Sequence, residues 1–484
     1  MPENVTARRE QQVIPTYIPK EPNAMPMFFE KKPYQGASGR LYPLPYSDGI
    51  TDEKKDVSYE VYTLENEYIQ TQVLPAIGGK ILSGYDKIGH YDFIYRNRVI
   101  KPALVGLAGA WISGGIEFNW PQHHRPTTFL PLEASLEENP DGSKTLWTGE
   151  VDPFYRMKGM AGITVEPSRS YIKAKIRVYN RTNLPQIFMW WANLAVAVNE
   201  SYRTIFPPDV EWVNDHDRRA VLQWPIAKGV YKSARPFDYG DGTDLSLYDS
   251  VKVPSSFLIS QGQSDMDFVA GYDGGLQKGI ATVADHHIAP GKKMWTWGHG
   301  DFGEMWCSNL TDEDGPYIEL MTGVYTDNQP DFTWIAPFET KEFEQYWYPI
   351  RDIGDVNARR AEARCAPDID LARIGKADGE AAVAVDHLDV VLQLTRDGEH
   401  GHRGRQVGLR DFGIGVSVGR HEQRADEDQQ EHGDDHAEGA DGELALHKAA
   451  DDLLDRADNL FDVVFGCALG LDIIGQALAA AKEE

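Results

Sequence analysis

One short segment of the chain brings together side chains that can move protons. Residues 114–121 read Gly-Gly-Ile-Glu-Phe-Asn-Trp-Pro and are soon followed by His123, His124 and Arg125. Carboxyl and imidazole groups can take up and release protons, so these residue types could take part in acid/base chemistry. In extended backbone, adjacent side chains point to opposite faces, so only one histidine can enter a cleft. The same alternation weakens a metal site built from both.

Aromatic side chains that could form a binding surface are spread over the same part of the chain. Trp295 and Trp297 are two residues apart, so in a strand they share one face. Indole rings pack against the C–H faces of pyranoses while polar groups contact the hydroxyls. The residues predicted to bind such a ligand are Arg125, Trp120, Trp191, Asn193, Trp297, Trp306, His299, Asp327 and Gln329.

A second carboxylate, Glu319, stands between Ile318 and Leu320. If these apolar neighbours face a core, alternation directs the carboxylate into a cleft on the other side. Opening a sugar ring requires one group to take the anomeric proton and another to protonate the ring oxygen. We predict Glu319 as the base and His124 or His123 as the acid. Glu117 and Glu319 are an alternative pair for glycosidic cleavage.

These residues must be positioned by strands, because residues 57–350 contain short β-branched and aromatic runs separated by turn sequences. Residues 171–178 alternate apolar with basic side chains, as a half-buried antiparallel strand does. Residues 139–142 and 272–275 are predicted turns. No segment keeps a helical period for three turns, so the glycine-rich residues 298–304 are predicted to be a loop lining the cleft. The pattern predicts a large two-sheet sandwich.

Composition divides the chain after residue 357. All 12 Trp and all 22 Tyr precede this point, while the last 127 residues hold 28 acidic residues against 14 Lys and Arg. We predict an N-terminal arm over 1–56, a sandwich over 57–357 and an acidic, low-order tail without function over 358–484. The tail fits a disordered arm, a segment with a short helix, or out-of-frame translation, and we favour the last.

The overall charge of −27 excludes a general affinity for nucleic acid or for anionic membranes. The three cysteines are widely spaced, and the first thirty residues lack the apolar core of a secretion signal, so we expect a cytoplasmic protein. We expect neither a metal nor a cofactor, and the sequence leaves the oligomeric state open.

Three segments resemble the galactose-mutarotase-like superfamily: residues 65–81, residues 114–121 and Tyr317-Ile-Glu-Leu320. Within this resemblance, Glu117 replaces a proline and Glu319 takes the place of the catalytic glutamate. Residues 10–357 more closely resemble domain-of-unknown-function family 5107, through GGIEFNWPQHHRPTT, DGPYIELMTGVYTDNQPDF and FEQYWYPI. The resemblance implies an all-β supersandwich. Because one fold hosts many functions, the resemblance implies less about activity than about fold.

We therefore predict a carbohydrate-binding protein with acid/base chemistry at an anomeric centre, most simply an epimerase or mutarotase. Its expected partner is a mono- or oligosaccharide. Two other functions stay open. One is a glycoside hydrolase on the same fold. The other is a non-catalytic sugar-binding or scaffold domain, because members of the resembled family often continue into tetratricopeptide repeats.

Overall fold

The computed structural model describes residues 5–23, 43–122, 124–215, 220–229, 231–232, 238–259, 262–326 and 332–353. These residues form an all-β structure, as predicted. The tail 358–484, His123, Asp327 and Gln329 lie outside the described residues.

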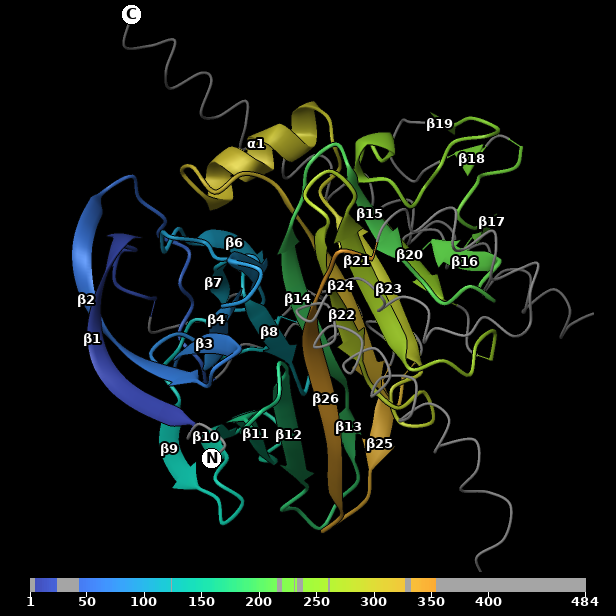
Figure 1. Cartoon of the computed structure of the whole chain (residues 1–484). Helices are drawn as coiled ribbons and strands as arrows, with labels where there is room; N and C mark the ends of the chain where they lie inside the picture. Colours follow the sequence, from blue (N-terminus) through green and yellow to red (C-terminus); the bar gives the residue numbers. More distant parts are fainter. Residues whose placement is uncertain are drawn as a thin grey trace, which may run out of the picture. The chain divides into compact units, whose positions relative to one another are not determined.

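The larger sheet has twelve strands. The predicted site residues Glu117, Asn193 and Glu319 lie on three neighbouring strands in the middle of this sheet. Figure 1 shows the course of these strands. Eleven of the strands follow one another in space, and β5 pairs with β4 beside this path. In spatial order they are β1 (Thr6–Tyr17), β2 (Lys54–Glu65), β3 (Ile69–Leu74), β4 (Lys80–Asp86), β8 (Ile116–Asn119), β14 (Trp190–Ala197), β24 (Tyr317–Val324), β23 (Gly291–Thr296), β20 (Ser255–Ile259), β16 (Trp212–Asp215) and β17 (Val221–Gln223), with β5 (Tyr91–Ile94) beside β4.

The second large sheet has eight strands. Their order is β15 (Tyr202–Ile205), β21 (Phe268–Asp273), β22 (Lys278–Val283), β26 (Thr340–Arg351), β12 (Ile172–Tyr179), β11 (Lys158–Val165), β10 (Lys144–Val151) and β9 (Glu133–Glu138). Three small pairs complete the β structure: β6 (Ala103–Gly106) with β7 (Gly109–Trp111), β13 (Gln186–Phe188) with β25 (Thr333–Ile335), and β18 (Tyr231–Lys232) with β19 (Asp238–Tyr239).

The main core lies between the two large sheets. Strand β8 contributes Phe118 and β14 contributes Trp190, while the smaller sheet contributes Phe343 and Trp347. The Phe118 and Trp190 rings stack with their centroids 5.3 Å apart, and Phe343 meets Trp190 edge-on at 5.5 Å. Full burial of each such ring contributes about 2–3 kcal/mol, so the core fixes which face of each central strand points inward.

A helix occupies part of the segment predicted to be a loop. Residues Asp301–Leu310 form α1, so the prediction of a cleft-lining loop without a following helix is wrong. Apolar Phe302, Trp306 and Leu310 recur every four residues, which gives one apolar stripe. Asp301 and Glu304 in the first turn interact favourably with the helix dipole. The helix was missed because it has fewer than three turns.

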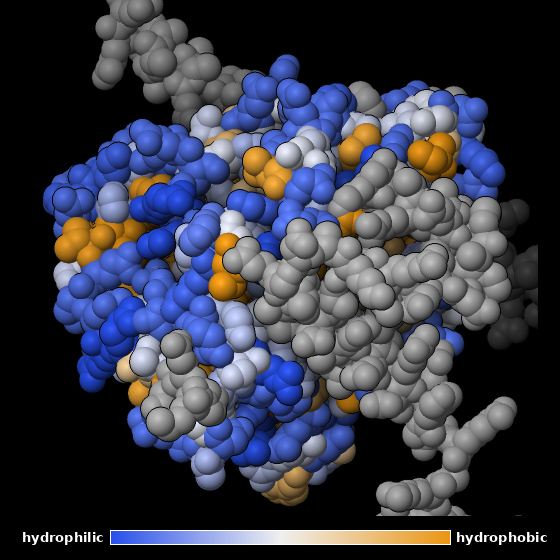
Figure 2. All heavy atoms as spheres, in the orientation of Figure 1, coloured by the Kyte–Doolittle hydropathy of each residue, from blue (hydrophilic) through white to orange (hydrophobic). Residues whose placement is uncertain are grey.

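On the face shown in Figure 2, the described residues are mainly hydrophilic, with small and separate apolar patches. Within the described residues, no helix is long and apolar enough to span a bilayer.

Candidate functional site

Strand register places the two predicted carboxylates on one face of the larger sheet. Glu117 of β8 pairs with Asn193 of β14, and Asn193 pairs with Met321 of β24. Glu319 lies two residues before Met321 and therefore points to the same side. Their sequence neighbours Ile116, Phe118, Ile318 and Leu320 belong to the main core on the opposite side. The alternation argument made for Glu319 thus agrees with the structure.

One glycine pair lies just before Lys80 and another just before Glu117. Gly114 and Gly115 have φ of +83° and +67°, and Gly78 and Gly79 have φ of +64° and +63°. A Cβ on Gly115 would lie only 1.9 Å from the carbonyl oxygen of Ile81. Side chains are therefore excluded at Gly115 both by conformation and by space.

We expect Gly115→Ala to lower the free energy of unfolding by at least about 3 kcal/mol, because strain at positive φ adds to the clash. Gly229→Ala is the matched control. Gly229 has φ of +73° and nothing within 4 Å of an added Cβ, so only about 1–2 kcal/mol is expected. Urea unfolding measures both values, and equal losses in the two variants would contradict the close packing at Gly115.

Glu117 is held as a carboxylate by donors from the segment that follows it. His124 Nδ1 lies 3.3 Å from Glu117 Oε2, and the Thr128 hydroxyl donates to Oε1 at 2.7 Å. Burial by itself would raise the pKa of Glu117, but the hydrogen bond and charge of His124, the charge of Lys80 and the Thr128 hydrogen bond lower it to about 2. Glu117 is therefore ionised at neutral pH.

His124 occupies an unusual backbone conformation beside this carboxylate. Its φ is +43°, a region that few residues other than glycine adopt. The edge of its ring meets Trp111 with the centroids 5.6 Å apart. Such local strain is typical of residues whose position serves a site.

Glu319 has the opposite electrostatic character. Asn193 Nδ2 donates to Glu319 Oε2 at 3.2 Å, and the side chain is almost fully buried. Burial raises the pKa of Glu319 to about 7, and the negative charge of Glu117 adds to this rise, against the opposing effects of His124, Lys80 and Lys293. One face thus carries one ionised carboxylate and one that exchanges protons near neutral pH.

Two buried lysines balance this charge. Lys80 donates to the carbonyl of Ile112 at 2.6 Å, and its Nζ lies 5.2 Å from the centre of the Trp111 ring. Burial lowers the pKa of Lys80 to about 8, although Glu117 and Glu319 both oppose this. Lys293, which pairs with Met321, lies over the Trp191 ring at 4.8 Å.

Several buried polar atoms on and near this face lack a hydrogen-bond partner. Within the described part of the chain these include both amide atoms of Asn119, the Oδ1 of Asn193, the Oε1 of Gln122 and the indole nitrogen of Trp111. Asn119 shares its face with Glu117, two residues away on β8. Because unpaired buried polar groups cost about 1–3 kcal/mol each, their concentration here favours a site that receives a polar ligand or water.

Indole rings continue from the carboxylates along β23. Trp295 is the direct cross-strand neighbour of Glu319 and stays partly exposed. Its ring meets Trp297 edge-on at 4.5 Å, and Trp297 stacks on Trp306 of α1 at 4.2 Å. The Trp297 indole donates to the Tyr317 hydroxyl at 3.2 Å.

The rings of Trp295, Trp297 and Trp306 together form an aromatic wall. A small cavity lies beside this wall and is lined in part by residues of α1. It is lined by residues that include Tyr95, Tyr248, Cys307 and Tyr317, and it has room for about a water molecule. A sugar ring cannot occupy it, so a platform for a sugar would use the partly exposed edge at Trp295.

The structure separates the predicted site residues into groups. It brings together Glu117, His124, Asn193 and Glu319, with Trp191 on the same face of β14. Trp297 and Trp306 lie further along the aromatic wall. His299 lies apart from the carboxylates, with its Nδ1 2.8 Å from Asp249 Oδ1 and its ring stacked on Tyr248.

Two predicted binding residues, Trp120 and Arg125, instead pack inside the protein. Trp120 follows Asn119 and therefore faces the opposite side, where it is buried in the main core. Arg125 is buried over the Trp120 ring and donates to Glu150 at 2.9 Å and to the carbonyl of Gly78 at 3.2 Å. Their assignment as sugar contacts is corrected, because both side chains are buried within the protein.

Sequence reasoning overlooked Lys80, Asn119 and Lys293. A signal existed for two of them, since Lys80 directly follows the first glycine pair and Asn119 alternates with Glu117. Lys293 joins the site only through the pairing of β23 with β24, which links residues far apart in the sequence.

Residues 37–350 match a family described as "Domain of unknown function (DUF5107)". Among solved structures, a TPR-domain containing protein from Parabacteroides distasonis is similar, with 21% identity and a TM-score of 0.61. The match covers 73% of this chain and 57% of that one, so the chain spans little more than half of that protein.

Two further solved structures are more distant. A galactose mutarotase-like protein from Clostridium acetobutylicum has 10% identity and a TM-score of 0.40, covering 61% of this chain and 96% of that one. A galactose mutarotase related enzyme from Lactobacillus acidophilus has 10% identity and a TM-score of 0.41, covering 61% and 98%.

Proposed function

The chain belongs to the DUF5107 family, as its sequence predicted, and from the geometry of its site we propose that it is a sugar-active enzyme, an epimerase or mutarotase. The observation that carries this proposal is the pair of buried carboxylates, Glu117 and Glu319, on one face of the sheet. Their surroundings hold one pKa at about 2 and the other at about 7. Carboxyl groups whose pKa values are driven apart are typical of acid/base sites.

In the proposed reaction, ionised Glu319 takes the proton from the anomeric hydroxyl of a pyranose. His124 donates a proton to the ring oxygen as the bond between this oxygen and the anomeric carbon breaks, which leaves an open-chain aldehyde. Rotation about the adjacent carbon–carbon bond and the reverse proton transfers close the ring with the other configuration. Ionised Glu117 stabilises positive charge on His124, and Asn193 orients Glu319 through their hydrogen bond.

The site offers the contacts that a hydroxylated ligand needs. The unpaired amide atoms of Asn119 and the free Oδ1 of Asn193 can bind hydroxyl groups, and the partly exposed Trp295 ring can pack against a pyranose face. We propose a mono- or oligosaccharide as the partner and the cytoplasm as the place of action.

Anomeric exchange of aldoses provides the test. Proton-exchange NMR on a panel of aldoses measures the rate at which the protein interconverts the two anomers above the spontaneous rate. We expect catalysis with kcat/KM rising about tenfold per pH unit below pH 7, because the base must be ionised and its pKa is about 7.

The direction of this pH dependence tests the role of Glu319. A rate that does not rise between about pH 5 and pH 7 would contradict its role as the base. If every aldose exchanges at the spontaneous rate at all pH values, the proposal of a mutarotase fails.

The same two carboxylates favour glycoside hydrolysis as a second candidate function. A neutral acid with a raised pKa beside an ionised partner is the arrangement that retaining glycosidases use. One strand, β14, separates their strands, and Glu319 is offset by two residues along β24, so the two Cα atoms lie roughly 12 Å apart across the sheet. Release of nitrophenol from aryl glycosides without anomeric exchange would favour this function, and sugar binding without either reaction would favour a binding domain.

A further inference from the structure

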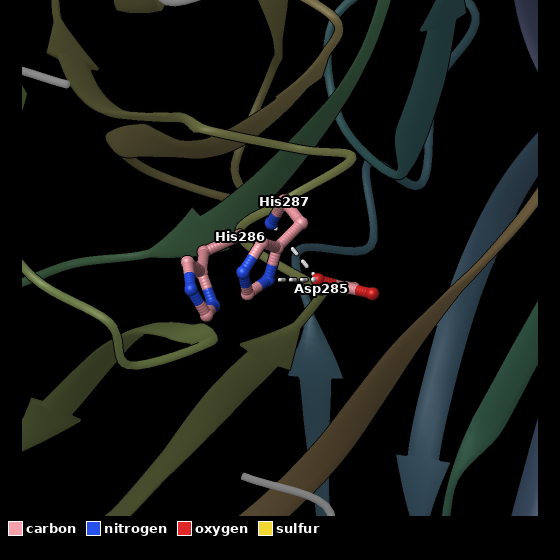
Figure 3. Close-up of side chains that lie close together, drawn as sticks. All are labelled: Asp285, His286 and His287. Carbon is pink, nitrogen blue, oxygen red and sulfur yellow. Dashed lines mark hydrogen bonds and ion pairs between the residues drawn. The ribbon is translucent and has the colours of Figure 1, made fainter. Parts of the chain in front are cut away.

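A second group of polar side chains lies on the loop between β22 and β23, separate from the carboxylates. Asp285, His286 and His287 are consecutive there, and their ligand atoms lie within 4.8 Å of one another (Figure 3). The two imidazole rings lie side by side with centroids 3.9 Å apart. Amide hydrogens of Ile288 and Ala289 both donate to the carbonyl of Asp285, which holds the turn closed.

A second loop orients His286. Asp267, just before β21, accepts hydrogen bonds at 2.7 Å from both the backbone nitrogen and the Nδ1 of His286. Because an ionised carboxylate only accepts, Nδ1 must carry the proton, and the lone pair of neutral imidazole then lies on Nε2. Metal-binding histidines are commonly oriented by such a carboxylate.

A further carboxylate faces this lone pair. His286 Nε2 lies 3.8 Å from Asp265 Oδ1. Two ligands that each lie about 2 Å from one tetrahedral ion are roughly 3.3 Å apart, so a small rotation of exposed Asp265 brings its Oδ1 to that separation from His286 Nε2. His287 Nδ1 lies 3.3 Å from Asp285 Oδ1, and these two groups are the next available ligands.

The local charge favours a cation. Asp265, Asp267 and Asp285 bring three carboxylates to the two loops, while buried Lys292 interacts with Asp267 and Asp285. Three negative charges and one positive charge leave a surplus of two, which a divalent ion neutralises. Imidazole with carboxylate suits Zn²⁺, Ni²⁺ or Cu²⁺ better than Ca²⁺ or Mg²⁺.

We propose that these loops form a binding site for a divalent transition metal, with His286 and His287 as nitrogen ligands and Asp265 and Asp285 as oxygen ligands. Asp267 is the positioning residue that holds His286 in the binding tautomer. The site is independent of the proposed sugar chemistry. It revises the expectation from the sequence, which assigned no metal.

Titration of the EDTA-dialysed full chain with ZnCl₂ and with CoCl₂ tests the site. Seven of the 14 histidines lie in the last 127 residues, and His432 and His436 stand beside Asp434 and Asp435 there. All proteins therefore carry His432→Ala and His436→Ala, which reduces metal binding by that segment. We expect one equivalent of Zn²⁺ by calorimetry and the visible absorption of tetrahedral Co²⁺, both lost in His286→Ala/His287→Ala. His90→Ala, at an exposed histidine outside the cluster, is the matched control and should bind as the parent does.

Asp267→Asn keeps every proposed ligand and should weaken the Kd for Zn²⁺ about 10- to 100-fold. His287→Ala alone, at a largely exposed side chain, should also weaken binding without unfolding the protein, which circular dichroism checks. The proposal is overturned if the parent binds no Zn²⁺ below about 1 mM. It is equally overturned if the His286/His287 double variant retains the stoichiometry and Kd of the parent.

Discussion

Glu319→Gln is expected to lower the rate of anomeric exchange by about 10²–10⁴-fold while sugar binding persists. Glutamine retains the shape of the side chain and can still accept the hydrogen bond from Asn193, but it cannot take a proton. Exchange NMR measures the rate, and ligand titration measures the binding. Glu342→Gln, at an exposed residue paired with Arg177, is the matched control and should leave both unchanged.

The same substitution should stabilise the protein at alkaline pH. Burial raises the pKa of Glu319 from 4.5 to about 7, so between these values the folded protein keeps a proton that the unfolded chain has lost. This favourable contribution is complete below pH 4.5 and is lost as the pH rises through 7. At pH 8 we expect Glu319→Gln to raise the free energy of unfolding by up to roughly 3 kcal/mol relative to its effect at pH 4.

A Glu319→Gln protein that exchanges anomers at the wild-type rate would refute the assignment of the base. A variant that loses activity together with stability at every pH would instead indicate a structural role for the carboxylate.

Glu117→Gln is expected to have the opposite effect on stability. Glu117 is ionised in contact with His124 and Thr128, and it interacts with buried Lys80. Its removal takes away the larger of the two carboxylate charges that offset the burial of Lys80, and a buried charge left uncompensated costs about 3–5 kcal/mol. Because the pKa of Glu117 is lowered to about 2, its contribution is present above pH 4.5 and is lost as the pH falls toward 2.

A double-mutant cycle isolates this interaction. Lys80→Met combined with Glu117→Gln should recover most of the stability that Glu117→Gln loses, because neither charge is then buried alone. Thr128→Val, which removes one hydrogen bond to Glu117, should cost only about 1 kcal/mol. Urea unfolding at pH 7 measures the wild type, the two single variants, the double variant and Thr128→Val. Additive losses in the double variant would show that Lys80 and Glu117 do not interact.

The family and the all-β class could be predicted from the sequence because they depend on local signals. Alternating apolar residues reveal a strand with one face in a core, and the same alternation placed Glu319 opposite Ile318 and Leu320. The same alternation places Trp120, one residue after Asn119, on the core side of its strand. The predicted binding role of Trp120 did not take this into account.

Other features depend on contacts between distant residues. Glu117 and His124 meet in a segment where the backbone at His124 adopts positive φ. Glu319 meets Asn193 through the pairing of β14 with β24. The helix α1 has only ten residues, so its sequence does not show a helical period over three turns. Packing of Leu310 against residues of the sheet stabilises it.

By itself, the sequence determined which residues could exchange protons and on which side of a strand each would point, because that depends on residue type and on the two-residue period of extended backbone. Only the tertiary structure decided which carboxylate stays ionised. Both are glutamates of equal intrinsic acidity, and the difference arises from burial and from neighbours that the chain supplies from other strands and loops.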